Sequence, residues 1–153
     1  MYQTLDDSDR RILAALQKDA SLSADQLAEA VGLSRNAAWR RMRLLEDAGV
    51  IRARVALADP DKLGCPLQVM IFVRTASHSA DWLDRFHRAV STLPEVVGAY
   101  RMTGDLDYLL RVRVADVPAY DAFYKKLIAR VPVSDISASF VMEEIKETTA
   151  LPL

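Results

Sequence analysis

The sequence predicts an α+β protein in which a winged helix-turn-helix domain precedes a ferredoxin-like domain of β-α-β-β-α-β order. Apolar residues recur at helical spacing in three short segments before residue 51, and a glycine separates the second segment from the third. From residue 67 onward, strand-like and helical patterns alternate. Proline, glycine and charge gather between the two regions at Ala58–Gly64, so we expect domains at residues 1–58 and 59–153.

The composition predicts a cytoplasmic protein with a locally basic surface. Hydrophobic residues make up 51% of the 153 positions, which is enough for a real core. No apolar run approaches the roughly 18 to 20 residues that a membrane span needs, and we find no export signal. Net charge is −1, yet residues 34–54 hold six arginines against only Glu46 and Asp47. A basic patch on a neutral body fits DNA reading better than nonspecific coating of DNA.

Two helices are expected before the basic segment, after loose residues 1–5. The first begins at Asp6 or Asp7, ends near Asp19, and braces the other two. The second opens with the capping-box pattern from Ser23 to Gln26. Gly32 follows where a tight turn between two helices would lie, so a helix-turn-helix is predicted.

The segment Ser34–Ile51 is predicted to be the helix that contacts DNA, with Ser34 as N-cap and Gly49 as its stop. Its buried face should hold Ala38, Met42 and Leu45, with Ala37, Leu44 and Ala48 beside them. Arginine suits phosphate and guanine while asparagine suits adenine, so the opposite face carries the chemistry of major-groove reading. The DNA contacts expected on this helix are Ser34, Arg35, Asn36, Trp39, Arg40 and Arg43.

Alternatives accompany these assignments. An arginine-rich helix face is often merely solvated, although the preceding turn favours DNA contact here. Arg41 projects toward the buried flank, so we expect it to pair with an acid such as Glu46 or Asp9. Trp39 lies at the edge of the outward face, where it either packs on DNA or covers the core of its own domain.

The segment Ile51–Leu57 alternates apolar and polar residues, which predicts a strand. Arg52 and Arg54 would share one face of it. The strand is either a wing beside DNA, with both arginines on phosphate, or an arm that pairs with a second subunit.

In the second domain, strands are expected at residues 67–73, 96–102, 108–114 and roughly 136–145, with helices near residues 82–93 and 117–131. Both helices would cover one sheet face. The other face would carry Leu, Val, Met and Phe from the first and last strands, which is too apolar to face water in a monomer. We therefore expect a two-fold dimer, sheet against sheet, which would also bring two recognition helices to successive major grooves.

The turn Thr103–Asp107 is a candidate ligand site. Gly104 lets backbone donors approach a carboxylate, while Asp105 and Asp107 offer acceptors for an ammonium group, and a zwitterion needs both. The alternative is an ordinary hairpin whose aspartates make local turn bonds. Met102 and Tyr108 flank the turn, where they either shape a side-chain pocket or belong to the core.

Seven stretches resemble the Lrp/AsnC, or feast/famine, transcriptional regulators. They are LDDSDRRIL at 5–13, LAEAVGLS at 27–34, RRMRLLEDAGVI at 40–51, DPDKLG at 59–64, PEVV at 94–97, TGDLDY at 103–108 and LPL at 151–153. The resemblance implies a winged helix-turn-helix, an amino-acid-binding domain of ferredoxin-like plan, and dimers that gather into octamers or similar assemblies. It also implies that a small effector binds between dimers near the glycine-aspartate turn.

One departure from the family concerns the last strand. Many members carry threonines there, but this chain has Ile136 and Ala138, which leaves Ser137 and Ser139 as the nearby hydroxyls. The effector contacts expected are Met102, Thr103, Gly104, Asp105, Asp107, Tyr108, Ser137 and Ser139.

The expected function is a sequence-specific transcriptional regulator that binds double-stranded DNA and responds to an amino acid or related metabolite. An architectural DNA-binding protein without an effector is the alternative. A small ferredoxin-like enzyme is a third possibility, but no acid-base or nucleophile pair supports it. His78 and His87 lack spaced ligand partners, so neither a metal nor a cofactor is expected.

Overall fold

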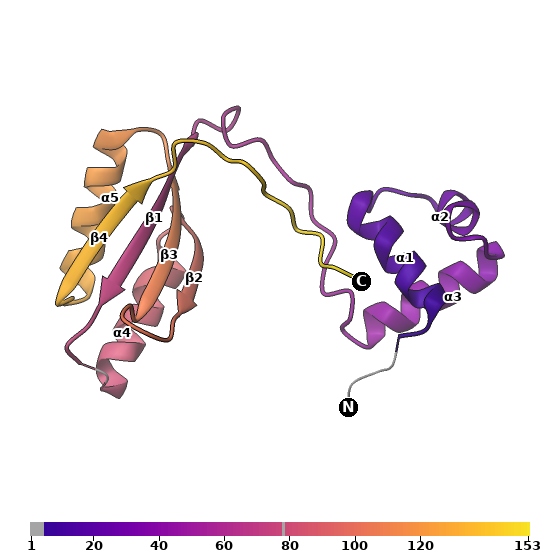
Figure 1. Ribbon diagram of the computed structural model, residues 1–153, viewed down its shortest axis with the longest axis horizontal. Helices are drawn as coiled ribbons and strands as arrows, with labels where there is room; N and C mark the ends of the chain where they lie inside the picture. The colour runs from indigo at the N-terminus through magenta and orange to yellow at the C-terminus, as the bar shows by residue number, and fades with distance from the viewer. Residues whose placement is uncertain (1–4, 78) are drawn as a thin grey trace. The chain divides into compact units, whose positions relative to one another are not determined.

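The computed structural model describes residues 5–77 and 79–153, and they form two compact units (Figure 1). One unit combines the chain up to Leu57 with Lys146–Leu153, and the other is Ala58–Ile145. The chain therefore crosses between the units twice. The expectations for residues 1–4 and for His78 lie outside the described residues.

Three helices build the first unit: α1 (Asp7–Lys18), α2 (Ala24–Val31) and α3 (Arg35–Asp47). Asp6 and Ser23 each form a capping box, as the sequence pattern predicts for Ser23. Gly32 ends α2 at φ +66°, a left-handed conformation that favours glycine. The buried side chains of this unit are Ile12, Leu13, Leu27, Ala28, Val31, Ala38, Met42 and Leu45.

The predicted orientation of α3 is confirmed in its main lines. Ser34 caps the helix, and Ala38, Met42 and Leu45 are its buried residues. Leu44 is 49% exposed, so the buried face is narrower than predicted. The reason is that α1 and α2 both pack against the side of α3 that carries Ala38 and Met42.

The strand predicted at Ile51–Leu57 is not formed, because residues 52–59 have no regular structure. The sequence alternation is present, but no described strand of this chain pairs with the segment. Val55 and Leu57 are 72% and 75% exposed as a result. An alternating segment forms a strand only when a second strand pairs with it. The prediction of a strand at Ile51–Leu57 was therefore wrong for the single chain.

The second unit is built on a four-stranded antiparallel sheet in the order β2-β3-β1-β4. Its strands are β1 (Leu67–Arg74), β2 (Val96–Arg101), β3 (Tyr108–Val114) and β4 (Asp135–Phe140). The last strand is shorter than predicted. The amide of Val141 donates to the carbonyl of Gln68 at 2.9 Å, and beyond it Pro66 has no N–H to continue the ladder.

Helices α4 (Ala80–Thr92) and α5 (Val117–Arg130) cover one face of this sheet, as Figure 1 shows. The core between them is dense in aromatic side chains. Phe86 stacks on Trp82 with ring centroids 5.1 Å apart, and Tyr108 lies 4.3 Å from Phe86. The β-α-β-β-α-β order and the placement of both helices on one face are as predicted.

The opposite face, called here the open face, is not covered by any helix of the unit. Alternation along β1 and β3 places Met70, Phe72 and Leu109 there, half-buried. The last strand contributes Ser137 and Ser139 rather than the apolar residues expected, because its Ile136 and Ala138 pack toward the helices. The open face therefore combines apolar side chains with polar ones, because Arg111 lies opposite Met70 and Ser137 lies opposite Phe72.

Candidate DNA interface and effector-binding turn

The outward face of α3 carries a row of polar side chains on its first two turns. Asn36 and Arg40 are exposed, and in the described part of the chain Arg40 makes no ion pair. Arg35 lies 3.4 Å from Asp25, with both side chains about 70% exposed, a pairing too solvated to hold it firmly. Ser34 accepts the amide of Ala37 at 3.3 Å, so its hydroxyl caps the helix. This end of α3 combines free donors with the positive end of the helix dipole.

Trp39 does not cover the core of its own domain. Its side chain is 44% exposed, and the guanidinium carbon of Arg43 lies 4.8 Å from its ring centroid. Arg43 also reaches Glu46 at 3.4 Å. Trp39 and Arg43 therefore form a stacked pair on the outward face, next to Arg40.

Arg41 points inward, as its place on the helix predicts. Its Nη1 lies 2.7 Å from Asp6 and 2.9 Å from Asp9. The amide of Asp9 and the guanidinium of Arg41 both donate to Asp6 and hold the pKa of that carboxyl below its usual range. The predicted pairing with Asp9 is confirmed, while Glu46 binds other arginines.

Arg52 and Arg54 do not lie on a strand, which corrects the prediction that they share one face of it. Arg54 folds back onto α3, where its Nη2 lies 2.6 Å from Glu46 and 2.8 Å from the sulfur of Met42. Arg52 is exposed on a segment without regular structure. Because a strand partner is missing in the single chain, Arg54 is anchored to the helix instead of presented with Arg52.

The turn between β2 and β3 is closed by backbone bonds. The amide of Met102 donates to the carbonyl of Asp107 at 2.8 Å, and Gly104 has φ +100°. A Cβ at Gly104 would meet nothing within 4 Å, so the conformation and not crowding requires glycine. Arg74, the last residue of β1, donates from Nε to the carbonyl of Asp105 at 2.8 Å. The turn is therefore fixed through its backbone, which leaves the exposed side chains of Thr103 and Asp105 on its surface.

The two aspartates of the turn differ in their surroundings. Asp107 is half-buried, and its Oδ2 accepts the amide of Thr75 at 2.8 Å, which ties the turn to the chain after β1. Asp105 is exposed, and the bond that fixes it uses its carbonyl and not its carboxylate. Of the two carboxylates, Asp105 is the one presented to solvent.

Tyr108 is placed in the core, which corrects its assignment to the rim of the turn. Only 3% of it is exposed, and its ring packs against Trp82 and Phe86. The first position of β3 points toward the helices, because Tyr108 alternates in register with Leu110 and Val112. Its hydroxyl is buried without a hydrogen-bond partner among the described residues. Met102 stays beside the turn and is 41% exposed.

The structure does not bring Ser137 and Ser139 to the turn directly. They lie on the open face of β4, opposite Phe72 and Met70 of β1, and β1 separates them from β3. Arg74 connects the two places, because its Nη1 also lies 3.4 Å from Asp135 at the start of β4. Arg74 and Asp135 were missed in the sequence, although a charged residue ending an apolar strand was a usable signal.

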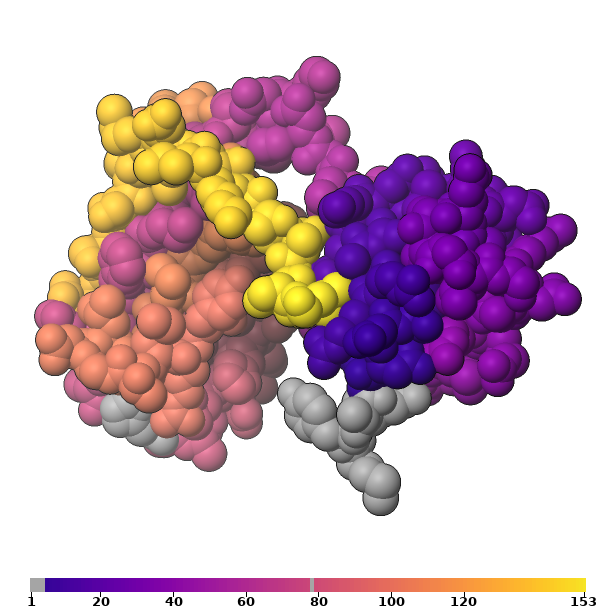
Figure 2. All heavy atoms as spheres, turned by 45° about the vertical axis from the view of Figure 1, so that its right-hand side comes forward, coloured from indigo at the N-terminus to yellow at the C-terminus, as the bar shows by residue number. Residues whose placement is uncertain are grey.

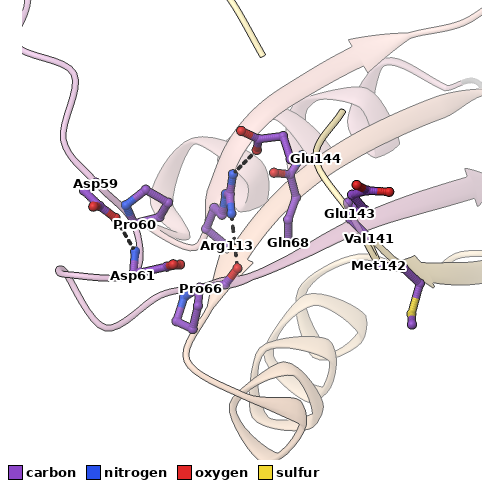
Figure 3. Close-up of a pocket in the computed structure, with 10 residues that line it drawn as sticks. All are labelled: Asp59, Pro60, Asp61, Pro66, Gln68, Arg113, Val141, Met142, Glu143 and Glu144. Atoms are coloured by element: carbon purple, nitrogen blue, oxygen red, sulfur yellow. Dashed lines mark hydrogen bonds and ion pairs between the residues drawn. The ribbon is translucent and has the colours of Figure 1, made fainter. Parts of the chain in front are cut away.

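A hollow of about 450 Å³ lies at the other end of β1 (Figure 3). Arg113 forms its floor, with its Nη1 3.2 Å from the carbonyl of Pro66 and its Nη2 2.9 Å from Glu144. Asp59, Asp61, Glu143 and Glu144 also line it. The sequence analysis missed this hollow, since its walls come from segments far apart in the chain. Among the described residues, no three His, Cys, Asp or Glu side chains gather to hold a metal ion. No described helix could span a bilayer.

Comparison with known proteins matches both halves of the chain. Residues 5–52 match the model of a winged helix-turn-helix DNA-binding domain. Residues 68–151 match the Lrp/AsnC ligand binding domain. The two models together span the three-helix unit, the sheet unit and most of the C-terminal segment.

Individual relatives agree over nearly the whole length. The glutamate uptake regulatory protein of Zymomonas mobilis is 52% identical over all of this chain and 93% of its own. A crystal structure of an AsnC family transcriptional regulator from Agrobacterium tumefaciens is 54% identical, with a TM-score of 0.94 over 97% of each chain. The regulator NMB0573 of Neisseria meningitidis, solved in complex with L-Met, is 38% identical with a TM-score of 0.93 over 97% of each chain. With its helix-turn-helix, its βαββαβ sheet and these relatives, the chain belongs to the Lrp/AsnC family of DNA-binding transcriptional regulators.

Proposed function

We propose that the protein reads specific DNA with the outward face of α3, and that an amino acid or related metabolite at the Gly104 turn adjusts this binding. The observation that carries the proposal is the row of exposed donors on a capped helix-turn-helix helix, with Arg40 unpaired among the described residues. Such donors match the acceptors that guanine and phosphate present in and beside the major groove.

The proposed DNA contacts divide by position. Ser34, Arg35 and Asn36 lie at the start of α3, where backbone amides and the helix dipole favour phosphate or base edges. Arg40 and the stacked pair of Trp39 and Arg43 lie one turn further on. Arg52 is a candidate phosphate contact from the connecting segment, whereas Arg54 supports α3 through Glu46.

The proposed effector site is the turn with Met102, Thr103, Gly104 and Asp105. Backbone amides around Gly104 would donate hydrogen bonds to a carboxylate, and the exposed Asp105 carboxylate would accept hydrogen bonds from an ammonium group. Asp107 and Arg74 would hold the turn in shape, and Ser137 would be reached only across Arg74 and Asp135. The relative solved with L-Met supports an amino acid as the ligand class. The proposed role is regulatory and not enzymatic.

The proposed assembly is a homodimer that joins open face to open face. Met70, Phe72 and Leu109 remain half-buried there, and Tyr100 of β2 is 49% exposed beside them. A second copy would cover these apolar side chains, and it would also offer the alternating segment Ile51–Leu57 a strand partner. Dimers would associate further, to octamers as the resemblance implies. The assembly would bind double-stranded DNA in the cytoplasm. The functional domains in this proposal are residues 1–58 and 59–153.

Fluorescence anisotropy tests the proposal. The probe is a duplex that the protein selects from a random pool, compared with its scrambled version, at fixed salt and with each common amino acid in turn. We expect specific binding that one amino acid shifts, and loss of that shift in Asp105→Ala with DNA binding retained. Equal affinity for both duplexes would contradict specific reading and favour an architectural role. Specific binding that no amino acid shifts would contradict the effector site alone.

A further inference from the structure

The C-terminal segment makes a two-point contact with α1. The side-chain amide of Gln17 donates from Nε2 to the carbonyl of Leu151 at 3.1 Å, and the amide of Leu151 donates to Gln17 Oε1 at 2.6 Å. In Figure 2 these last residues, in yellow, lie against the indigo residues of the same unit. One primary amide thus satisfies both backbone groups of one residue, as a neighbouring strand would.

The same segment is anchored at its other end in the sheet unit. Val141 donates to the carbonyl of Gln68 at 2.9 Å, and Glu144 binds Arg113 at 2.9 Å on the floor of the hollow in Figure 3. Between these anchors and Leu151 the chain has no helix or strand. Two fixed ends and an irregular middle describe a connection and not a frayed terminus.

We propose that Val141–Leu153 is a strap that restrains the DNA-binding unit, and that Gln17 is the residue that holds its far end. The strap acts in parallel with the connecting segment near Leu57, so the DNA-binding unit is tied to the sheet unit at two points. This inference uses DNA binding by the helix-turn-helix but requires no effector. Its failure is therefore distinguishable from failure of the effector site.

A second tie matters because the proposed homodimer, on which this step rests, would place two recognition helices on two half-sites. A unit held by one flexible segment samples more orientations, so fewer of them suit a second half-site after the first is bound. Docking of the strap removes part of this freedom before DNA is met. The strap should therefore raise affinity for DNA with two half-sites and leave a single half-site unaffected.

Hydrogen exchange of the Leu151 amide tests the docking directly in the full-length protein without DNA. We expect Gln17→Leu to raise its exchange rate by about tenfold, because the amide loses its acceptor. Leu151→Ala is the matched control, since Gln17 contacts only the backbone of residue 151 and the bonds should survive. Equal exchange in wild type and Gln17→Leu would overturn the proposal.

Binding to selected duplexes tests the consequence. We expect Gln17→Leu to weaken binding to a duplex with two half-sites by roughly five- to tenfold, and binding to the same duplex with one half-site scrambled by less than twofold. Leu151→Pro removes the donated amide from the other partner and leaves α1 untouched, so it should reproduce the effect. Equal weakening on both duplexes would show a merely structural role for Gln17. No weakening on either duplex would show that the strap does not restrain the unit.

Discussion

Arg41 differs from the other arginines of α3 because its side chain lies between two carboxylates and is largely shielded from solvent. Its side chain is 28% exposed and joins α3 to the start of α1 through Asp6 and Asp9. We expect Arg41→Ala to lower the melting temperature by a few degrees, since Asp9 would remain in a largely buried position without its cation. Thermal unfolding followed by circular dichroism measures this, and an unchanged melting temperature would contradict the structural role.

Arg40 should behave in the opposite way. It is exposed and makes no ion pair in the described part of the chain, so its removal costs the fold little. We expect Arg40→Ala to keep the wild-type melting temperature and to weaken specific DNA binding by about tenfold. Anisotropy at several salt concentrations would also tell a phosphate contact from a base contact, because only the former reduces the salt slope by about one. Undiminished affinity would remove Arg40 from the interface.

Asp6 should make the stability of the first unit depend on pH in the acidic range. The Asp9 amide and Arg41 lower the pKa of Asp6 in the folded protein, so folding favours the ionised carboxyl. This stabilisation is present above the unfolded pKa and is lost as pH falls through the folded value, that is, below about pH 4. In Asp6→Asn, which keeps a capping oxygen, we expect a urea midpoint below wild type at pH 7, with the difference closing below about pH 4. A constant difference between pH 7 and pH 3 would contradict this assignment.

Some single residues could be placed from the sequence and others could not. The inward direction of Arg41 follows from helical periodicity alone, and so do the buried positions Ala38, Met42 and Leu45. Tyr108 could not be placed this way, because at the first position of a strand its direction depends on where the strand begins. Arg54 was misplaced because its partner Glu46 lies on another element.

At the scale of elements, the groups that hold the Gly104 turn in shape differ from the group proposed to bind the effector. Its backbone is held by Arg74 and Met102, while the Asp105 carboxylate faces solvent. We expect Asp105→Ala to leave the melting temperature unchanged and to remove the response of DNA binding to the effector. Gly104→Ala should instead destabilise the fold by about 1–2 kcal/mol, since φ +100° strains any residue with a Cβ. Comparing both variants by thermal unfolding and anisotropy distinguishes these roles, and a full response in Asp105→Ala would move the site elsewhere.

Elements that depend on local pattern and caps were predicted well, and elements that depend on a partner were not. All five helices of the described residues were predicted, because each has apolar periodicity and each begins at a Ser or Asp cap. The segments at 51–57 and 142–145 carry apolar residues suited to strands, yet neither has a ladder partner among the described strands. Alternation indicates that a segment can form a strand, but the strand forms only where the edge of a second strand is available to pair with it.

For the whole molecule, the open face of the sheet is the surface on which the proposed dimer depends. Phe72 lies on this face between Leu109 and Ser137, and it is half-buried without a described helix above it. If the proposed open-face dimer forms, we expect Phe72→Glu to keep the secondary structure of the unit but to convert dimers to monomers, because the substitution would bury a carboxylate in the interface. Sedimentation velocity measures the change, and Ser139→Glu on the border of the same face is the milder control. Dimers that persist in Phe72→Glu would place the interface on another surface.

The architecture of the sheet unit could be predicted from the order of its segments, since a β-α-β-β-α-β chain with antiparallel neighbours has few compact arrangements. The return of Lys146–Leu153 to the helical unit could not. That stretch has no periodicity, and its contact with Gln17 joins residues 134 positions apart. A contact made through the backbone of one partner leaves no signature in the side chains of that partner.

The two parts of the divided helical unit are synthesised at different times. Its three helices leave the ribosome early, but the segment that completes their surface follows only after the whole sheet unit has been made. At ordinary translation rates the interval between residues 57 and 146 is roughly 5–20 s, far longer than helix packing requires. A nascent chain therefore has folded helices without a docked strap while the sheet is still being synthesised. Docking of Leu151 on Gln17 therefore follows synthesis of the sheet unit, and a chain stalled before residue 146 would fold its helices yet lack the second tie.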